Sequence, residues 1–344
     1  MSPYAGAMLG SNVIVPVAPL LDDDEAARIV DLCTRFGRYR TYGELEPIEI
    51  PEGPGLVPRH DSVMNFVSTG GLHRAEEPAR TLAARTSYFR EEYAYGGELI
   101  APDIAPFLFS PRLADAGRVV HGRPVVEPQI AYANLMVPGQ ELAVHTDVPE
   151  FRGVSRKTVP QWLLVVMHHS GLFDEHRLHI ATGIAWFSDL DGGALAYWPD
   201  GVDGELVHHP IHANTALVLD TDSVFHGVDR VSPVAADAMP PIRPGCGLRP
   251  EGDRWIVRGP DESVLADYRW SELRLSVSWK AYCFASEGDR DTWRAHADDL
   301  TLDAILETLR ADLSERRGER VERNEHLGLA LIDEYIRFPV VTPA

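Results

Sequence analysis

The stretch at positions 128–147 reads PQIAYANLMVPGQELAVHTD and decides the fold. Its first ten residues form a β-rich run, and Pro138-Gly139 supplies a turn directly after it. Tyr132 and Asn134 alternate along this run, so we expect both side chains on one face of a strand. His145 and Asp147 are also two positions apart at the end of an apolar segment. The stretch therefore predicts a strand, a turn and a polar pair at the end of a second strand.

Further β-rich runs follow at short intervals, separated by Gly, Pro and Asp. They are QWLLVVMHH (161–169), IAWFS (184–188), GALAYW (193–198), TALVLD (215–220) and LRLSVSWKAYCF (273–284). Many short strands with regular turn signals are typical of an antiparallel sandwich or jelly roll. We expect a mainly β core with flanking helices.

The flanking segments have other patterns. Helical spacing and an acidic start predict a helix over 22–36, and a second helix is expected over 76–95. Prolines and glycines predict loops or an edge strand over 39–71 and an irregular insertion over 234–266 that lies outside the barrel and is mobile. The segment 291–337 returns to a helical period. One structural domain is expected, with an N-terminal region (1–124), a β core (125–285) and a C-terminal helical region (286–344).

Composition excludes several classes of protein. The 344 residues include 52 Asp and Glu against 32 Lys and Arg, a formal net charge of −20, and such a surface repels nucleic acid and anionic membranes. Three cysteines without metal-ligand spacing argue against a disulfide framework and a structural zinc site. No leader peptide or membrane-length apolar run is readable. We expect a cytoplasmic protein with neither nucleic acid nor membrane as partner, and the sequence leaves its oligomeric state open.

The pair His145 and Asp147 gains meaning from the residues that follow it. A His-x-Asp triplet alone is weak evidence, because a second copy occurs at His296 and Asp298 in the helical tail. Only the first copy is followed, in order, by a Gly-Gly strand entry, a distal histidine and a strand arginine, which are Gly192-Gly193, His226-Gly227-Val228 and Arg274. Two imidazoles and one carboxylate on one face suit Fe(II) and leave positions open for other ligands.

This ordered set resembles the non-haem Fe(II), 2-oxoglutarate-dependent dioxygenases, and within them the prolyl-hydroxylase-like branch, over positions 128–284. The resemblance implies a double-stranded β-helix (jelly-roll, cupin-like) core. It implies Fe(II) held by His145, Asp147 and His226, with 2-oxoglutarate and O2 as co-substrates.

Arg274 and Ser276 lie two apart in an apolar strand and should point the same way. The resemblance implies that Arg274 binds the distal carboxylate of 2-oxoglutarate through its planar fork, with Ser276 adding a hydrogen bond. His226 and Arg274 are 48 positions apart, much further than in the family. The other arginines after the histidine therefore stay candidates: Arg230, Arg243 and Arg249.

Other residues are candidates for binding the 2-oxo acid or the substrate. The resemblance implies that Tyr132 and Asn134 help to hold the 2-oxo acid, although a buried tyrosine with a satisfied amide fits equally. Trp186 and Trp198 could wall a substrate pocket or belong to the core, and Arg152 could meet a substrate carboxylate or lie on the surface. The histidines at positions 168, 169, 176 and 179 fit no metal-ligand spacing and are expected to lie on the surface or to pack in the fold.

We therefore predict an oxygenase that oxidises an unactivated C–H bond of a small molecule, such as an amino acid or a specialised metabolite. Hydroxylation, desaturation and cyclisation begin with the same hydrogen abstraction, so the sequence does not separate them. The alternatives are an iron oxidase or dioxygenase that works without 2-oxoglutarate, and a barrel that binds a small molecule without catalysis.

Overall fold

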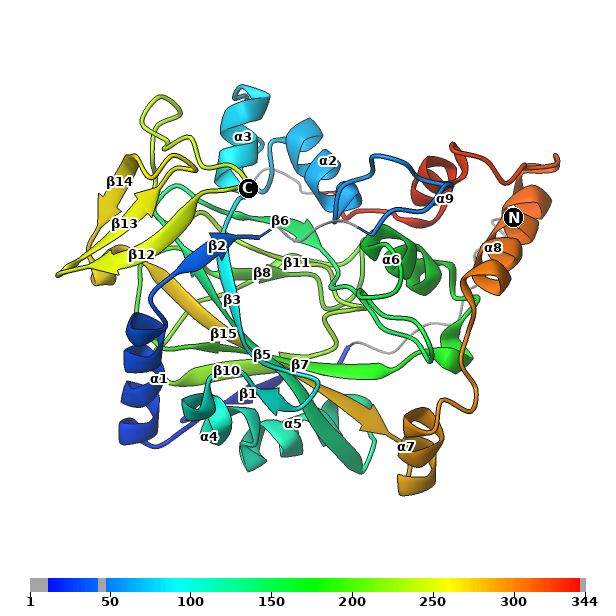
Figure 1. Ribbon diagram of the computed structural model, residues 1–344, viewed down its shortest axis with the longest axis horizontal. Coiled ribbons are helices and arrows are strands. Elements are labelled where there is room, and N and C mark those ends of the chain that lie inside the picture. The colour runs from blue at the N-terminus through cyan, green and yellow to red at the C-terminus, as the bar shows by residue number, and fades with distance from the viewer. Residues whose placement is uncertain (1–11, 43–47, 341–344) are drawn as a thin grey trace.

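The computed structural model describes residues 12–42 and 48–340, and consists of two facing β-sheets with helices around them (Figure 1). Residues 1–11, where a leader peptide would begin, lie outside the described residues. So do residues 43–47 of the predicted 39–71 loop and residues 341–344 of the C-terminal region. In the described part of the chain, no helix is both long enough and apolar enough to cross a membrane.

Eight strands form the core, as two antiparallel sheets of four. The central part of the large sheet has the order β10-β7-β15-β5, and the small sheet has the order β6-β11-β8-β9. These strands are β5 (Val125–Met136), β6 (Leu142–His145), β7 (His179–Trp186), β8 (Leu195–Tyr197), β9 (Val207–His209), β10 (Thr215–Leu219), β11 (His226–Val228) and β15 (Arg274–Phe284). Two facing four-stranded sheets joined in this order form a jelly roll, the double-stranded β-helix, and this confirms the predicted fold class.

Side chains alternate across β15, the central strand of the large sheet. Ser276 lies opposite Asn134 of β5 on one side and Trp186 of β7 on the other. Leu275 and Val277 pack into the core on the outer face of the sheet, which α5 covers. The polar residues of the strand consequently point to the inside of the barrel.

The large sheet continues beyond the barrel. From β5 its order is β3-β2-β12-β13-β14, with β4 paired to β3 and β1 added to β10 at the opposite edge. The bounds are β1 (Val15–Val17), β2 (Tyr39–Thr41), β3 (Phe89–Tyr95), β4 (Glu98–Leu99), β12 (Gly247–Glu251), β13 (Arg254–Arg258) and β14 (Val264–Tyr268).

The prediction that the insertion over 234–266 is irregular is wrong for its second half, whereas its mobility stays a prediction. Three strands, β12 to β14, form there and join the large sheet through β2, where Leu248 pairs with Tyr39. Leu248, Trp255 and Val257 are buried in the core on the outer face of the sheet. Burial of these side chains outweighs the unfavourable strand propensity of the neighbouring glycines and Pro250.

Nine α-helices surround the sheets in the described residues. They are α1 (Asp23–Phe36), α2 (His60–Thr69), α3 (Ala79–Arg85), α4 (Ala105–Leu108), α5 (Pro111–His121), α6 (Gln161–Ser170), α7 (Glu287–Arg294), α8 (Leu302–Arg317) and α9 (Leu327–Tyr335), with short 3-10 turns at Pro102–Ile104, Asp174–His176 and Trp270–Glu272. The helix predicted near 22–36 is confirmed, and Asp22 and Glu25 close a capping box at its start.

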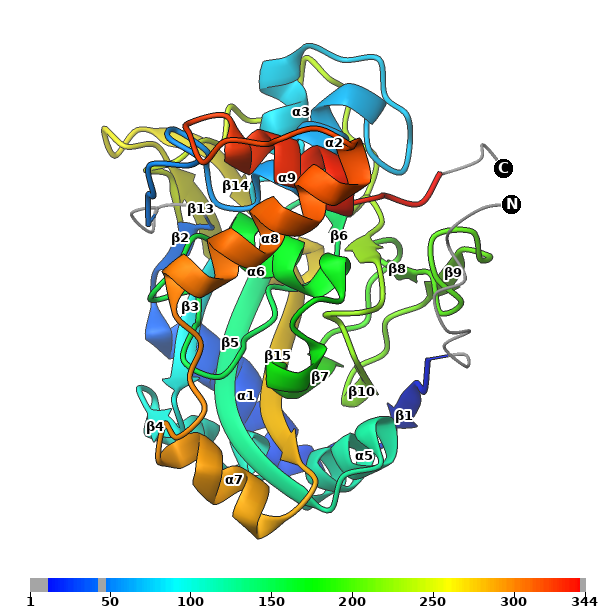
Figure 2. The same cartoon turned by 90° about the vertical axis from the view of Figure 1, so that its right-hand side faces the viewer.

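Three local predictions are wrong. The segment 76–95 is a short helix, α3, followed by strand β3, and 39–71 contains helix α2. The run at 161–169 is helix α6 and not a strand. Its consecutive side chains from Trp162 to Met167 are all buried, against α8 and α9 among others (Figure 2). A helix that is apolar all round has no amphipathic period, so its sequence resembles that of a buried strand.

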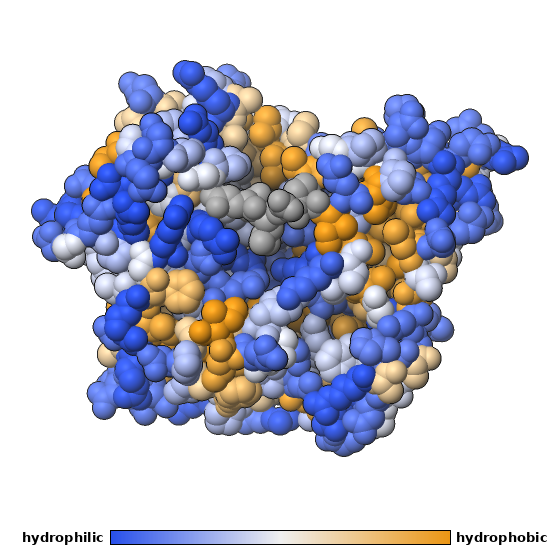
Figure 3. All heavy atoms as spheres, viewed as in Figure 1, coloured by the Kyte–Doolittle hydropathy of each residue, from blue (hydrophilic) through white to orange (hydrophobic). Residues whose placement is uncertain are grey.

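Hydrophilic side chains dominate the periphery of the face seen in Figure 1, and apolar ones are divided among smaller patches (Figure 3). The three cysteines, Cys33, Cys246 and Cys283, are buried and free.

One buried arginine connects three segments that lie next to the small sheet. Arg85, at the end of α3, donates to the Glu77 carboxylate at 2.5 and 2.7 Å. It also donates to the carbonyl oxygens of Gly139 and Val234, both at 2.9 Å. The guanidinium thus joins α3, the β5–β6 turn and the segment after β11.

Arg85→Leu should lower the free energy of unfolding by about 3 to 5 kcal/mol, because it leaves the Glu77 charge and two carbonyl groups without their partner. Urea denaturation measures the change. Arg118→Leu is the matched control, since the Arg118–Asp115 pair is largely exposed and should lose far less. Equal losses in both variants would contradict the role of Arg85.

Candidate active site

Two histidines and an aspartate meet inside the barrel at the small sheet. His145 ends β6, His226 begins β11, and the two residues are register partners. Asp147 follows β6, and its Oδ1 atom lies 3.4 Å from Nε2 of His145 and 3.9 Å from Nε2 of His226. The three potential ligand atoms lie within 4.8 Å of one another. The chain thus brings together the three residues that the sequence predicted as metal ligands, and no second group of three such ligands occurs in the described residues.

Hydrogen bonds orient both imidazole rings. Nδ1 of His145 lies 2.8 Å from the carbonyl oxygen of Ala143, and Nδ1 of His226 lies 3.0 Å from that of Val224. Because a carbonyl oxygen only accepts, each Nδ1 donates its hydrogen to that oxygen, and each Nε2 is left facing Asp147. Burial, with the nearby His145 adding to it, lowers the pKa of His226 to about 3, so this ring is neutral. Neutral imidazoles with a fixed tautomer are the form that binds a metal ion.

The carboxylate of Asp147 is fixed from its other side. Oδ2 accepts hydrogen bonds from Nζ of Lys280 and Oγ1 of Thr221, both at 2.7 Å. Burial alone would raise the pKa of Asp147, but the Lys280 ammonium holds it well below its usual range. Oδ1 is left facing the two Nε2 atoms. This donor set, N, N and O from one side, fits a divalent iron site with open positions.

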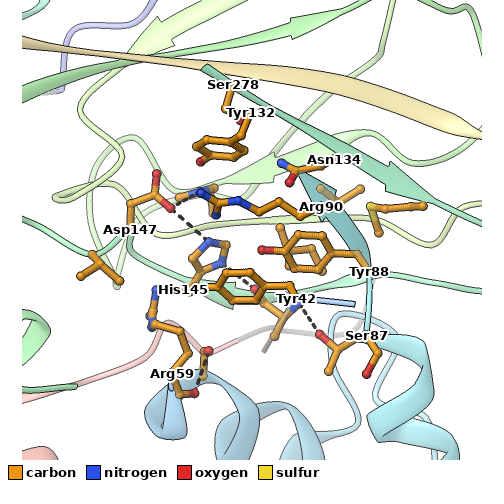
Figure 4. Close-up of a pocket in the computed structure, with 18 of the residues that line it drawn as sticks. Tyr42, Arg59, Ser87, Tyr88, Arg90, Tyr132, Asn134, His145, Asp147 and Ser278 are labelled. Carbon is orange, nitrogen blue, oxygen red and sulfur yellow. Dashed lines mark hydrogen bonds and ion pairs between the residues drawn. The ribbon is translucent and has the colours of Figure 1, made fainter. Parts of the chain in front are cut away.

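The three residues line a pocket of about 370 Å³ that occupies the barrel interior. Its walls come from both sheets and from the N-terminal region, including Tyr42, Tyr88 and Arg90 (Figure 4). The volume is within the range of small-molecule sites.

Arg274 lines the same pocket and has no anionic partner in the described residues. It is 1% exposed; Nε donates to the carbonyl oxygen of Gly193 at 2.7 Å, Nη1 donates to Oγ of Ser276 at 3.0 Å, and Nη2 has no hydrogen-bond partner. Burial without a counter-charge lowers its pKa to about 9. A buried guanidinium that lacks an anion is suited to bind the carboxylate of a ligand.

The competing arginines are placed elsewhere. Arg230 is paired with Glu141, and Arg249 with Glu251 and Glu262. Arg243 is exposed and does not line the pocket. The long spacing between His226 and Arg274 is taken up by the excursion through β12 to β14.

Tyr132 and Asn134 line the pocket as the alternation along β5 predicts (Figure 4). The buried Oδ1 of Asn134 has no hydrogen-bond partner in the described residues. An amide acceptor left open in this position is available to a ligand.

The three residues suggested for substrate binding do not line this pocket. Trp186 is fully buried in an apolar cluster at the end of the barrel and stacks on His209, and Trp198 packs on Val144 and Phe225. Arg152 pairs with Asp289 and Asp298. None of the three therefore has the suggested place in the pocket. The two tryptophans are part of the apolar core, and Arg152 forms ion pairs with the C-terminal region.

Sequence reasoning missed several polar residues in and around the pocket. Lys280 continues the alternation of Arg274 and Ser276 along β15, so the period of two could have identified it. Thr221 directly follows the predicted TALVLD strand. Arg90 had no such signal, because it was placed in an expected helix.

Comparisons with known proteins give fold-level matches only. No protein-family model matches the chain, and no curated protein matches it. Among solved structures, the non-haem α-ketoglutarate-dependent epimerase SnoN from nogalamycin biosynthesis is 12% identical, covers 79% of each chain and has a TM-score of 0.41. A prolyl-4-hydroxylase from Pseudomonas putida is 14% identical over 79% of this chain and 93% of its own, with a TM-score of 0.37.

HygX from Streptomyces hygroscopicus, solved with nickel, 2-oxoglutarate and hygromycin B, is 11% identical over 79% of this chain and 83% of its own, with a TM-score of 0.38.

His226→Ala should reduce Mn(II) or Fe(II) affinity by at least about a hundredfold, because one of three ligands is removed. Anaerobic calorimetric titration of the metal measures the loss. His296→Ala is the control: His296 belongs to the other His-x-Asp triplet, is exposed and contacts Asp299 instead. Unchanged metal binding in His226→Ala would rule out the proposed ligand set.

Proposed function

We propose that this protein is an Fe(II)/2-oxoglutarate-dependent oxygenase that acts on a C–H bond of a small molecule. The observation that carries the proposal is the presence, in one buried pocket, of a His-Asp-His donor set and of a guanidinium without an anion. The donor set is suited to bind iron, and Arg274 is suited to bind the carboxylate of an acidic co-substrate.

His145, His226 and Oδ1 of Asp147 would hold the metal ion. Iron, 2-oxoglutarate and O2 together supply the oxidation, in which the 2-oxo acid loses CO2 to give succinate and one oxygen atom is available for the substrate. Lys280 and Thr221 keep Asp147 deprotonated and turned toward the metal position.

Arg274 would bind the distal carboxylate of 2-oxoglutarate, with Ser276 fixing the plane of the guanidinium. Tyr132 and the open amide oxygen of Asn134 flank the same space. The burial of these groups excludes water from the reacting atoms and strengthens their electrostatic interactions.

The direct test is an anaerobic titration with Fe(II) and 2-oxoglutarate, followed by exposure to O2 with a panel of small molecules. We expect succinate to form in proportion to the 2-oxoglutarate consumed, with one member of the panel oxidised. Oxidation of a substrate without 2-oxoglutarate would indicate an oxidase instead. Binding of the panel with neither product would indicate a non-catalytic barrel.

Arg274→Leu should raise the dissociation constant of 2-oxoglutarate on the Mn(II)-loaded protein at least about tenfold, because a charge-assisted contact of about 1.5 to 3 kcal/mol is lost. Metal affinity should be nearly unchanged. Arg249→Leu is the matched control, since Arg249 already has two carboxylate partners outside the pocket. A larger defect in the Arg249 variant would show that the anchor lies elsewhere.

A further inference from the structure

A second guanidinium reaches into the pocket beside the proposed metal position. Arg90 lies on β3, and its side chain points toward His145 and Asp147 (Figure 4). Its Cζ atom lies 3.5 Å from the centroid of the Tyr132 ring. The side chain is 11% exposed, and its guanidinium lies over the rings of Tyr132 and Tyr42. Among the described residues, its ion pair within 4 Å is with Glu92, which is 3.7 Å away and turned partly to solvent.

Arg156 brings another cation to the same wall. Its side chain is 12% exposed, its Nε atom has no hydrogen-bond partner, and Glu150 is 3.7 Å away. Glu150 also accepts a hydrogen bond from the Tyr282 hydroxyl, so its charge is shared. Burial and the positive charge of Arg156 both act to lower the pKa of Arg90, although the surrounding tyrosines outweigh them. Two cations held near each other in this way are stabilised by an anion between them.

Arg90 and the Arg274 anchor lie on different strands, with β5 between them. Arg274 belongs to β15 of the eight-stranded core, whereas Arg90 and Tyr88 come from the N-terminal region. Tyr42 and Tyr88 stack at 5.1 Å with an interplanar angle of 16° and give the wall a flat apolar surface next to the cations. The contrast with the net charge of −20 is large: among the described residues, the pocket is lined by five cationic side chains and one carboxylate, Asp147.

We infer that the substrate carries a carboxylate, that Arg90 binds it through its planar fork with Arg156 adding charge, and that the tyrosine pair packs on a flat or apolar body. This inference rests on the proposed function, in which 2-oxoglutarate occupies the Arg274 side of the pocket. An Arg90 that binds the substrate carboxylate is a specificity-determining residue, because a neutral analogue leaves its guanidinium buried without a partner.

The test compares carboxylates with their primary amides on the full chain loaded with Zn(II) and 2-oxoglutarate. Benzoate, 3-phenylpropanoate and hexanoate are titrated by calorimetry, each against its own amide. At least one carboxylate should bind about tenfold or more tightly than its amide. Arg90→Met should abolish this preference and leave 2-oxoglutarate affinity unchanged, and Arg274→Leu should do the reverse.

Two further variants distinguish the loss of the Arg90 contact from a general disturbance of the fold. Arg80→Met, on the exposed surface of α3, should behave as the wild type. Arg90→Lys keeps the charge but loses the fork, so it should retain a reduced preference for the carboxylate.

The inference is overturned if no carboxylate of the series binds below about 10 mM, if every amide binds as well as its acid, or if Arg90→Met loses 2-oxoglutarate affinity instead. Failure of the proposed function gives a different result: the wild-type chain would then bind no 2-oxoglutarate. The comparison of acid with amide can be repeated on the metal-free protein and still decides the role of Arg90.

Discussion

Strand β15 buries a row of polar side chains on the inner face of the barrel, and the rest of the site is built to accommodate them. The outward residues of the strand are apolar and packed, whereas Arg274, Ser276, Ser278 and Lys280 point inward and are at most 4% exposed. A buried charge is costly unless it is paired and hydrogen-bonded. Lys280 is satisfied by Asp147 and Thr182, while Arg274 has only neutral partners. The strand therefore has one paired and one unpaired cation.

The paired cation links the two sheets. Lys280 belongs to the large sheet, and Asp147 follows a strand of the small sheet, so their ion pair fixes the carboxylate against the two imidazoles. Thr221, after β10, holds the same carboxylate oxygen. The geometry of the three ligands consequently depends on contacts from both halves of the barrel, as expected for a preorganised metal site.

Much of this arrangement could be predicted from the sequence, because strands alternate with a period of two. The same rule predicts that Tyr132 and Asn134 share one face of their strand and that Arg274 and Ser276 share one face of theirs. The order of the motifs predicts that His145, Asp147 and His226 form one metal site. The errors have physical causes. An all-apolar helix, α6, has no helical period, and burial at the edge of the large sheet stabilised strands that propensity alone disfavoured.

The substrate side of the pocket could not be predicted in the same way. The sequence left open whether Trp186 and Trp198 wall a pocket or belong to the core, and in this fold they are core residues. The wall is instead formed by residues far apart in the chain, among them Tyr42 and Arg90, which only the sheet pairing brings to the barrel. Local sequence patterns carry no information about such contacts.

An X-ray structure of the protein with Mn(II) and 2-oxoglutarate tests the central claim most directly. We expect the metal ion on Nε2 of His145, Nε2 of His226 and Oδ1 of Asp147, with the distal carboxylate of 2-oxoglutarate on the free edge of Arg274. A metal ion bound elsewhere, or a 2-oxoglutarate carboxylate seated on Lys280 or Arg90 while Arg274 stays without an anion, would contradict the account.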